Sequence, residues 1–208
     1  MTDESRLQVT PGSSRGLLKA RSGLIARGLR EAAKLETHND PWLATRRLAE
    51  QGDADAQYEH GWEYAGDFDG GTNEDYASAA RWFRKASEQG HAKAQHQLGR
   101  MYLFGTGVIQ DYTEALKWFR KAAVQGDTSA QYNLGVMYYL GEGVPQDYIQ
   151  AHMWSNLAAR SFVPGTFNRN VDLIARQMTP QQIIEAQRLA HEWKTKATDS
   201  VRDEDHLA

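Results

Sequence analysis

The sequence repeats itself, and this feature constrains the fold more than any other. Residues 91–126 align with 127–162 without a gap and are identical at sixteen of the thirty-six positions. An earlier copy, 53–90, keeps the same landmark residues and has two extra residues before its second half. Tandem repeats of this length are typical of arrays in which each unit buries its apolar surface against the next. The copies are therefore expected to stack into one continuous core.

Each copy predicts a pair of helices. In 91–126, Ala94, Leu98 and Tyr102 recur at i, i+4 and i+8, and a second apolar stripe begins at Tyr112. The glycines of the segment GTGVIQD separate the two stripes. Asp111 with Glu114 predicts a capping box at the start of the second helix. The sequence thus predicts an all-α protein built from helical hairpins.

Three glycines and three tryptophans recur at fixed positions of the repeat. A glycine inside a helix costs about 1 kcal/mol relative to alanine. We therefore expect the glycines to let paired helices approach closely, and the tryptophans to fill the space between neighbouring hairpins. The glycines are Gly61, Gly99 and Gly135, and the tryptophans are Trp82, Trp118 and Trp154.

The segment AQHQLGRMYLFGTGVIQDYTEALKWFRKAAVQG resembles a Sel1-like repeat, a relative of the tetratricopeptide repeat. The resemblance covers 53–162, divided into repeats 53–90, 91–126 and 127–162. It implies a right-handed α-solenoid of stacked helical hairpins that binds protein partners and has no catalysis of its own. The first copy departs from the pattern, because His60 stands at a leucine position and AGDFDGGTNED replaces the GxGV loop.

The same resemblance implies that the first helices line a concave face on which a protein or peptide binds. Trp62 is expected to stand clear of the packing as an interaction hot spot, and Arg100 to pair with a partner carboxylate. Tyr58 and Tyr132 can equally be packing residues within their repeats. The residues expected on this face are Tyr58, Trp62, His96, Arg100, Leu103, Tyr132, Val136 and Tyr139.

Helical caps are expected at both ends of the array. Residues 41–52 read as a lone second helix, and 163–197 as two closing helices, the last of which starts at Thr179-Pro180 and runs to about Lys196. Residues 1–40 are a basic and partly disordered arm, and 198–208 a disordered tail. The segment 15–35 carries a net charge of +5. It is expected to bind anionic lipid as an amphipathic helix, to dock on the array, or to stay frayed.

Composition excludes several classes of site. The chain has no cysteine, so disulfides, thiolate nucleophiles and thiolate metal sites are absent. Its net charge of −3 gives no electrostatic footprint for nucleic acid. No signal peptide or transmembrane stretch is visible, which favours a cytoplasmic location.

Ligand motifs are weak throughout the sequence. His91 and His96 are five residues apart, which is not the spacing of a helical zinc site, so no metal is expected. The acidic loop 67–75 begins like a calcium loop, but it lacks the glycine and glutamate that such a loop requires, and a solvated connection is the better interpretation. Gly105, Gly107, Gly141 and Gly143 resemble phosphate-binding glycines but follow helices, so we interpret them as chain reversals.

These observations favour a non-catalytic protein-binding scaffold or adaptor without a cofactor or a small-molecule substrate. No SxxK motif occurs. Two alternatives stay open. One is a hydrolase, such as a β-lactam-binding or β-lactam-hydrolysing enzyme, and the other is a membrane-associated accessory protein that acts through 15–35.

Overall fold

The computed structural model describes residues 41–66, 72–161 and 168–205, and these residues contain helices but no strand. The chain divides into two compact units, Met1–Arg47 and Leu48–Ala208. The array lies in the second unit. The helices are α2 (Pro41–Glu50), α3 (Ala54–Ala65), α4 (Asn73–Glu88), α5 (Ala92–Phe104), α6 (Tyr112–Val124), α7 (Thr128–Leu140), α8 (Tyr148–Ser161), α9 (Asn168–Ala175) and α10 (Pro180–Asp205).

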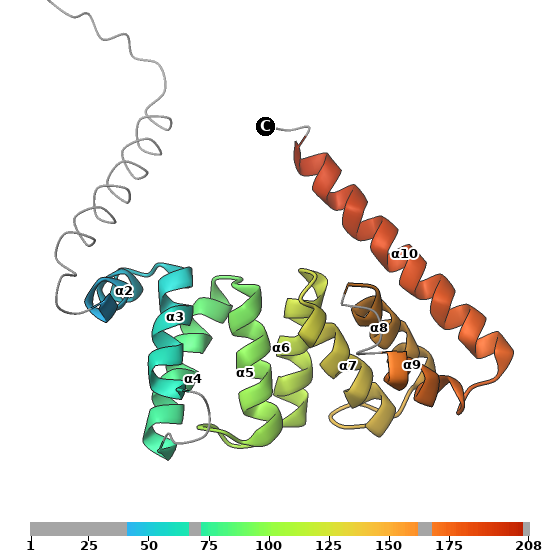
Figure 1. Ribbon diagram of the computed structural model, residues 1–208, viewed down its shortest axis with the longest axis horizontal. Helices are drawn as coiled ribbons and strands as arrows, with labels where there is room; N and C mark the ends of the chain where they lie inside the picture. The colour runs from blue at the N-terminus through green and yellow to red at the C-terminus, as the bar shows by residue number, and fades with distance from the viewer. Residues whose placement is uncertain (1–40, 67–71, 162–167, 206–208) are drawn as a thin grey trace, which may run out of the picture. The chain divides into compact units, whose positions relative to one another are not determined.

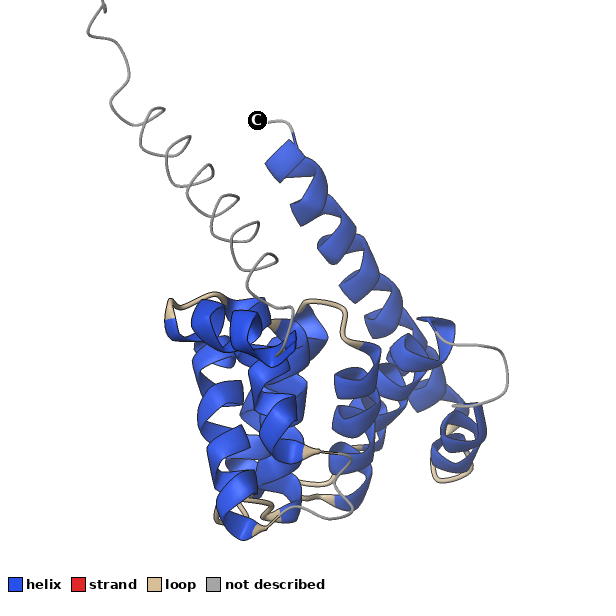
Figure 2. Cartoon of the chain, turned by 60° about the vertical axis from the view of Figure 1, so that its left-hand side comes forward, coloured by secondary structure: helices blue, strands red, loops and turns tan. Residues whose placement is uncertain are grey.

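Helices α3 to α8 form three stacked hairpins. Each first helix packs on the second helix of its own hairpin (α3 on α4, α5 on α6, α7 on α8), and each second helix packs on the next first helix (α4 on α5, α6 on α7). Figure 1 shows the resulting row, and in Figure 2 the described residues of the array are helices and loops. The predicted all-α solenoid of helical hairpins is confirmed.

Glycine and a ring bring the two helices of a hairpin together. A Cβ atom added at Gly99 would lie 2.7 Å from Cδ1 of Phe119, and one added at Gly61 would lie 2.6 Å from Cε1 of Phe83. Both rings are fully buried. The expected packing reason for these helical glycines is therefore present, since the phenyl ring occupies the space that a side chain would need.

A ladder of glutamines joins successive hairpins. Gln95 donates from Nε2 to the carbonyl of Ser87 at 3.0 Å, and Gln125 donates to Oε1 of Gln95 at 2.8 Å. Gln57 makes the same two contacts. Its Nε2 donates to the carbonyl of Ala49 at 3.1 Å, and its Oε1 accepts from Nε2 of Gln89 at 2.7 Å. Because a buried polar group must be satisfied, each rung fixes the register between one second helix and the next first helix.

The third rung of the ladder is incomplete. Gln131 donates to the carbonyl of Ala123 at 3.2 Å, but among the described residues no donor reaches its buried Oε1. The position that corresponds to Gln89 and Gln125 is Ser161. The ladder therefore ends at the third hairpin.

The tryptophans fill their predicted places in part. Trp118 is 6% exposed and shares a core cluster with residues of α4 and α5, as expected for a residue between hairpins. Trp154 packs edge-on against Trp193 of α10 at 5.0 Å. Trp82 is only half-buried, and its ring lies 4.8 Å from His60 of its own hairpin, so the expectation fails for this residue.

Helix starts differ in detail from the expected capping boxes. Asp111 accepts from the backbone N–H groups of Thr113 and Glu114, but Glu114 pairs with Lys117 instead of returning to Asp111. The backbone N–H of Asp111 donates to the carbonyl of Tyr102, so it leaves Glu114 no donor to cap. The reciprocal box occurs at Thr72 and Asp75 of the first hairpin.

The C-terminal cap begins as expected and ends later. Thr179 and Gln182 form the reciprocal box at the start of α10. The helix then continues to Asp205, past Lys196 and into the 198–208 tail that was expected to be disordered. No glycine or proline interrupts the sequence after Pro180, which is consistent with a continuous helix.

Candidate functional site

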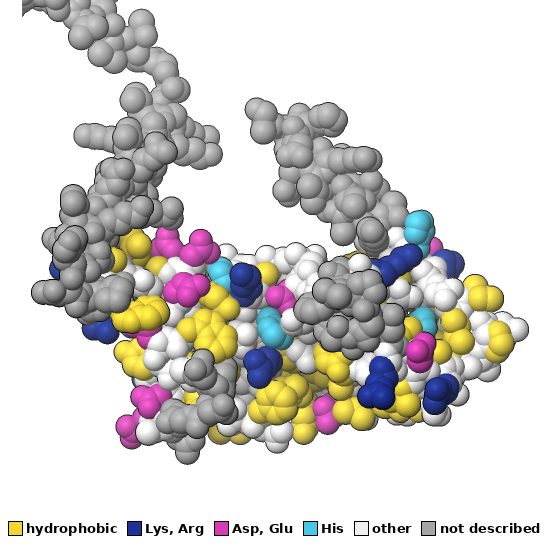
Figure 3. Space-filling view, viewed as in Figure 1, with side chains coloured by type: hydrophobic (Ala, Val, Ile, Leu, Met, Phe, Trp, Pro, Cys, Tyr) yellow, Lys and Arg dark blue, Asp and Glu magenta, His cyan; other side chains and the backbone are white. Residues whose placement is uncertain are grey.

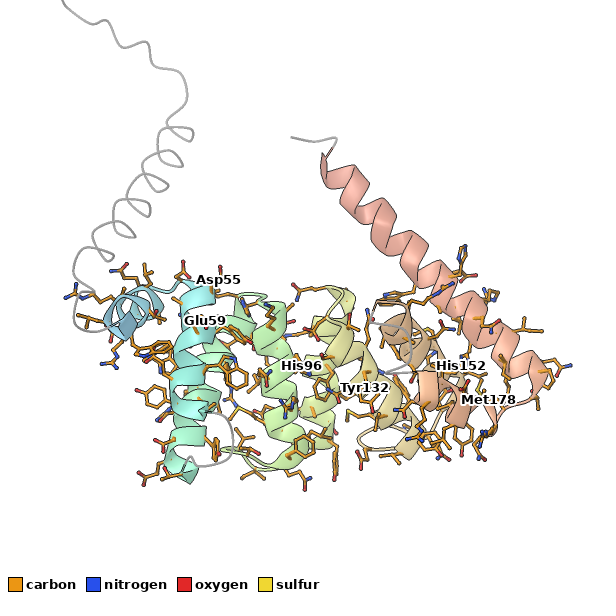
Figure 4. All side chains as sticks on the ribbon, in the orientation of Figure 1. Asp55, Glu59, His96, Tyr132, His152 and Met178 are labelled. Carbon is orange, nitrogen blue, oxygen red and sulfur yellow. The ribbon has the colours of Figure 1, made fainter. Side chains whose placement is uncertain are left out.

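The eight residues expected on the partner-binding face occupy three repeat positions on the first helices. Figure 4 shows two of them, His96 on α5 and Tyr132 on α7, together with Asp55 and Glu59 on α3. All eight side chains are half-buried. The first position holds Tyr58, His96 and Tyr132; the second holds Trp62, Arg100 and Val136; the third holds Leu103 and Tyr139.

The first position is used to connect successive repeats. Tyr58 stacks on His91 of the next hairpin, with the ring centroids 4.6 Å apart. The amide of Asn133 lies 3.1 Å from Nε2 of His96, and Asn170 of α9 donates to the hydroxyl of Tyr132 at 2.9 Å. Tyr58 also packs within its own repeat, as its alternative interpretation held, because its ring centroid lies 5.8 Å from that of Phe83. The hydrogen bond of Tyr132 joins α7 to α9.

His96 is held neutral at this junction. Burial lowers the pKa of its imidazole, and the nearby Arg100 lowers it further, while Asp127 opposes both effects. An uncharged ring leaves one nitrogen free to accept a hydrogen bond from the Asn133 amide. At neutral pH this position therefore contributes a hydrogen-bonded bridge and no positive charge.

The second position is more packed than the sequence suggested. Trp62 does not stand clear of the core: its ring lies edge-on to Phe83 at 5.7 Å and to Tyr58 at 6.3 Å. Arg100 donates from Nη1 to Oε1 of Gln97 at 3.4 Å. Val136 follows at the same position of α7 with a half-buried side chain.

The third position adds apolar surface beside the second. Leu103 and Tyr139 both pack against the larger core cluster, and the ring of Tyr139 lies 5.8 Å from that of Tyr148. Leu103 lies on α5 with Arg100, and Tyr139 lies on α7 with Val136, and each of these side chains is partly exposed. The face formed by the second and third positions, hereafter the first-helix face, therefore combines one guanidinium with half-buried apolar groups.

Charge on the first helices is uneven. Helix α3 carries acidic residues and no lysine or arginine, and Asp55 and Glu59 are exposed. Figure 3 shows acidic side chains gathered over this end of the face. Asp55 approaches Nε2 of His91 at 3.4 Å, yet burial still lowers the pKa of His91 overall. Helices α5 and α7 contain no acidic residue.

The motifs that resembled ligand sites have structural roles. A Cβ atom at Gly107 would lie 2.3 Å from the backbone of Tyr76, and one at Gly143 would lie 2.6 Å from that of Tyr112. These glycines therefore allow each loop to rest on the preceding hairpin. Asp75, at the described end of the acidic loop, caps α4, and its hydrogen bonds with Thr72 lower its pKa. The rest of that loop, 67–71, lies outside the described residues.

The next question is whether histidine and carboxylate side chains come together in the described residues. No group of three or more His, Asp or Glu side chains is placed to hold a metal ion within the described ranges. A close His–carboxylate pair, His60 Nδ1 and Glu63 Oε2 at 2.7 Å, lies in the packing of the first hairpin beside Trp82. Within those ranges no helix is both long and apolar enough to cross a bilayer. The basic segment 15–35 lies outside them.

Sequence reasoning missed the residues that connect the repeats. Asn133 lies 37 residues after its partner His96, and Asn170 lies 38 residues after its partner Tyr132. Because the two spacings differ by one residue, the sequence does not show that the two asparagines have equivalent roles. The glutamines had a visible signal, because the pair Ala-Gln recurs in all three copies, at Gln57, Gln95 and Gln131.

Comparison with known proteins gives one family. The Sel1 repeat matches residues 54–91, 92–127 and 128–161. A solved structure of c5321, described as a protective antigen of uropathogenic Escherichia coli with an SLR fold, is similar with a TM-score of 0.73 and 32% identity. The match covers 91% of this chain and 42% of that one, so this chain spans less than half the length of that relative.

A second solved structure, a Sel1 repeat protein from Oxalobacter formigenes, is similar with a TM-score of 0.54 and 35% identity over 61% of this chain and 95% of that one. No curated protein matches the sequence. Because the three matched repeats cover more than half of the residues and coincide with the three hairpins, the chain belongs to the Sel1 repeat family.

Proposed function

We propose that this protein is a non-catalytic scaffold or adaptor that binds a protein partner on its first-helix face. The observation that carries the proposal is the alignment of Arg100, Leu103, Val136 and Tyr139 on neighbouring helices of a Sel1 repeat array. Sel1 repeat proteins typically serve as interaction scaffolds. A row of partly exposed apolar side chains beside a guanidinium has the composition of an interface core.

The contacts of the first position support this location. Tyr58 and His96 connect one hairpin to the next, and Tyr132 connects the third hairpin to α9, which keeps the helices that carry the face in a fixed register. A rigid, preformed face loses little conformational freedom on binding. The partner is expected to offer a carboxylate to Arg100 and apolar side chains to Leu103, Val136 and Tyr139.

The hydrolase alternative has no observation in its favour. The described residues give no metal cluster, and the loop glycines that resembled phosphate motifs support helix packing. The membrane alternative depends on 15–35, outside the described residues.

A photo-crosslinking experiment followed by affinity measurement tests the proposal. A photoreactive residue at Val136 should label a partner in cell extract, and the purified partner should then bind the wild-type protein. Because these side chains are only half-buried, Arg100→Glu with Val136→Lys should weaken binding by more than about tenfold while the helical spectrum is retained.

Arg176→Glu is the matched control. This exposed residue follows α9, and reversing its charge should leave the affinity unchanged. If the folded Arg100→Glu, Val136→Lys variant binds as tightly as wild type, the first-helix face is not the binding site.

A further inference from the structure

A second charged surface runs over the second helices α4 and α6. The segments RWFRK and KWFRK recur in the first two hairpins, and they place exposed cations at three equivalent positions. We call this set the basic strip. Its members are Arg81 and Lys117, Arg84 and Arg120, and Lys85 and Lys121.

Neighbouring aromatic side chains hold four of these cations in place. Arg84 donates to the hydroxyl of Tyr102 and Arg120 to that of Tyr138, in each case across to the next first helix. Lys85 Nζ lies 3.8 Å from the ring centroid of Trp82, and Lys121 Nζ lies 4.3 Å from that of Trp118. Both arrangements repeat, so the positions of the charges are set by the repeat.

These four cations have no carboxylate partner among the described residues. Lys117 is the member of the strip that forms an ion pair there, with Glu114 at 3.0 Å. Asp75 of α4 is occupied by its capping box. Exposed Glu88 lies one turn beyond Arg84 and Lys85 on α4 without an ion pair to either, so it only partly offsets the positive charge of the strip.

The third hairpin shows where the strip stops. Its equivalent residues are Met153, Asn156 and Leu157, and α8 packs against α10. Met153 and Leu157 are buried. The cations thus occur on the two second helices that α10 leaves uncovered. Two of these positions recur with the same tyrosine and tryptophan contacts in both hairpins, an arrangement that charges placed only for solubility would not need.

We propose that the basic strip binds an acidic segment of a partner protein, on a different surface from the first-helix face. The planar forks of Arg84 and Arg120, anchored on tyrosines, suit carboxylates, which they can bind bidentately. The net charge of −3 gives the chain no general electrostatic attraction for nucleic acid. On α4 and α6 the large apolar side chain that is strongly exposed is Val124, and a single valine is too little apolar surface to hold a helix in a bilayer.

The test uses the full-length protein and two short labelled peptides, one of alternating glutamate and alanine and one with glutamine in place of glutamate. The glutamate peptide should bind and the glutamine peptide should not. Added salt should weaken this binding, because the cations are exposed. Arg84→Gln, Lys85→Gln, Arg120→Gln with Lys121→Gln should weaken it by more than about tenfold.

Two controls separate the strip from general charge and from the fold. Lys93→Gln with Arg176→Gln removes exposed cations elsewhere and should leave peptide affinity unchanged. The pair Lys85→Gln and Lys121→Gln keeps both tyrosine hydrogen bonds and should still weaken binding measurably, with an unchanged helical spectrum.

Three results would overturn the proposal: no difference between the two peptides, unchanged affinity in the folded quadruple variant, or tighter binding to phosphatidylserine vesicles or to an oligonucleotide than to the glutamate peptide. Arg100→Glu should not affect the peptide, so failure here is distinguishable from failure of the first-helix face.

Discussion

The first and second hairpins have the same backbone plan and different cores. Leu98 and Met101 of the second hairpin are fully buried, and their counterparts in the first are His60 and Glu63, paired at 2.7 Å. Both hairpins nevertheless keep the contact of a helical glycine with a phenyl ring and the glutamine rung to the preceding helix. The comparison indicates that close helix contact and buried amides specify the hairpin, and that apolar residues at these two positions are replaceable.

The largest difference in stability between the two hairpins is expected at their equivalent tryptophans, Trp82 and Trp118. Trp118→Ala should lower the free energy of unfolding by about 3–5 kcal/mol, because it removes a large buried side chain between hairpins. Trp82→Ala should cost less than half as much, since that ring is half-buried. Denaturant unfolding of the two variants measures both values. Equal losses would show that the first hairpin packs as tightly as the second.

The polar pair of the first hairpin gives the next effect. His60→Leu with Glu63→Met installs the residues of the second hairpin and should leave stability unchanged or raise it, because replacing both partners of a buried hydrogen bond by apolar residues avoids their desolvation. Thermal unfolding monitored by circular dichroism tests this. A marked destabilisation would mean that the pair is required by its surroundings.

The glycine contact should behave alike in both hairpins. Gly99→Ala and Gly61→Ala each place a Cβ atom against a buried ring, which should cost about 1–3 kcal/mol of overpacking and exceed the gain of about 1 kcal/mol in helix propensity. Urea titration of the two variants gives the costs. If either alanine variant is more stable than wild type, the contact does not limit helix approach there.

The smallest effect is a pH dependence from the third hairpin. His152 is buried, and burial lowers its pKa. Below about pH 6.5 the unfolded chain takes up the proton more readily, so stability should fall with pH below this value and be insensitive to this group above it. His152→Leu, which copies Leu116, should lose less stability between pH 7 and 5 than wild type.

Unfolding at a series of pH values checks this expectation, and the change for one such group is limited to about 1.4 kcal/mol per pH unit. His91 and His96 also have lowered pKa values and stay in the variant, so the difference between the two proteins isolates His152.

The fold was predictable because its signals are local and repeated. The apolar stripes, the helical glycines and the loop glycines recur at the repeat period and gave the hairpins, their stacking and the close helix contacts. The site was predictable only as a set of positions. Whether Trp62 is packed depends on Phe83 twenty-one positions away, and the bridges of His96 and Tyr132 depend on Asn133 and Asn170, whose spacing differs by one residue. Such contacts require the helices to be placed first.

Deletion of residues 91–126 tests most directly the claim that each hairpin offers the same contacts to its neighbour. After the deletion Gln131 stands eight residues beyond Ser87, which is the spacing of every rung in the ladder. The shortened protein should therefore keep its mean residue ellipticity at 222 nm and unfold cooperatively at a lower temperature. Loss of most of that helical signal would contradict the account, because it would show that the hairpins are not interchangeable units.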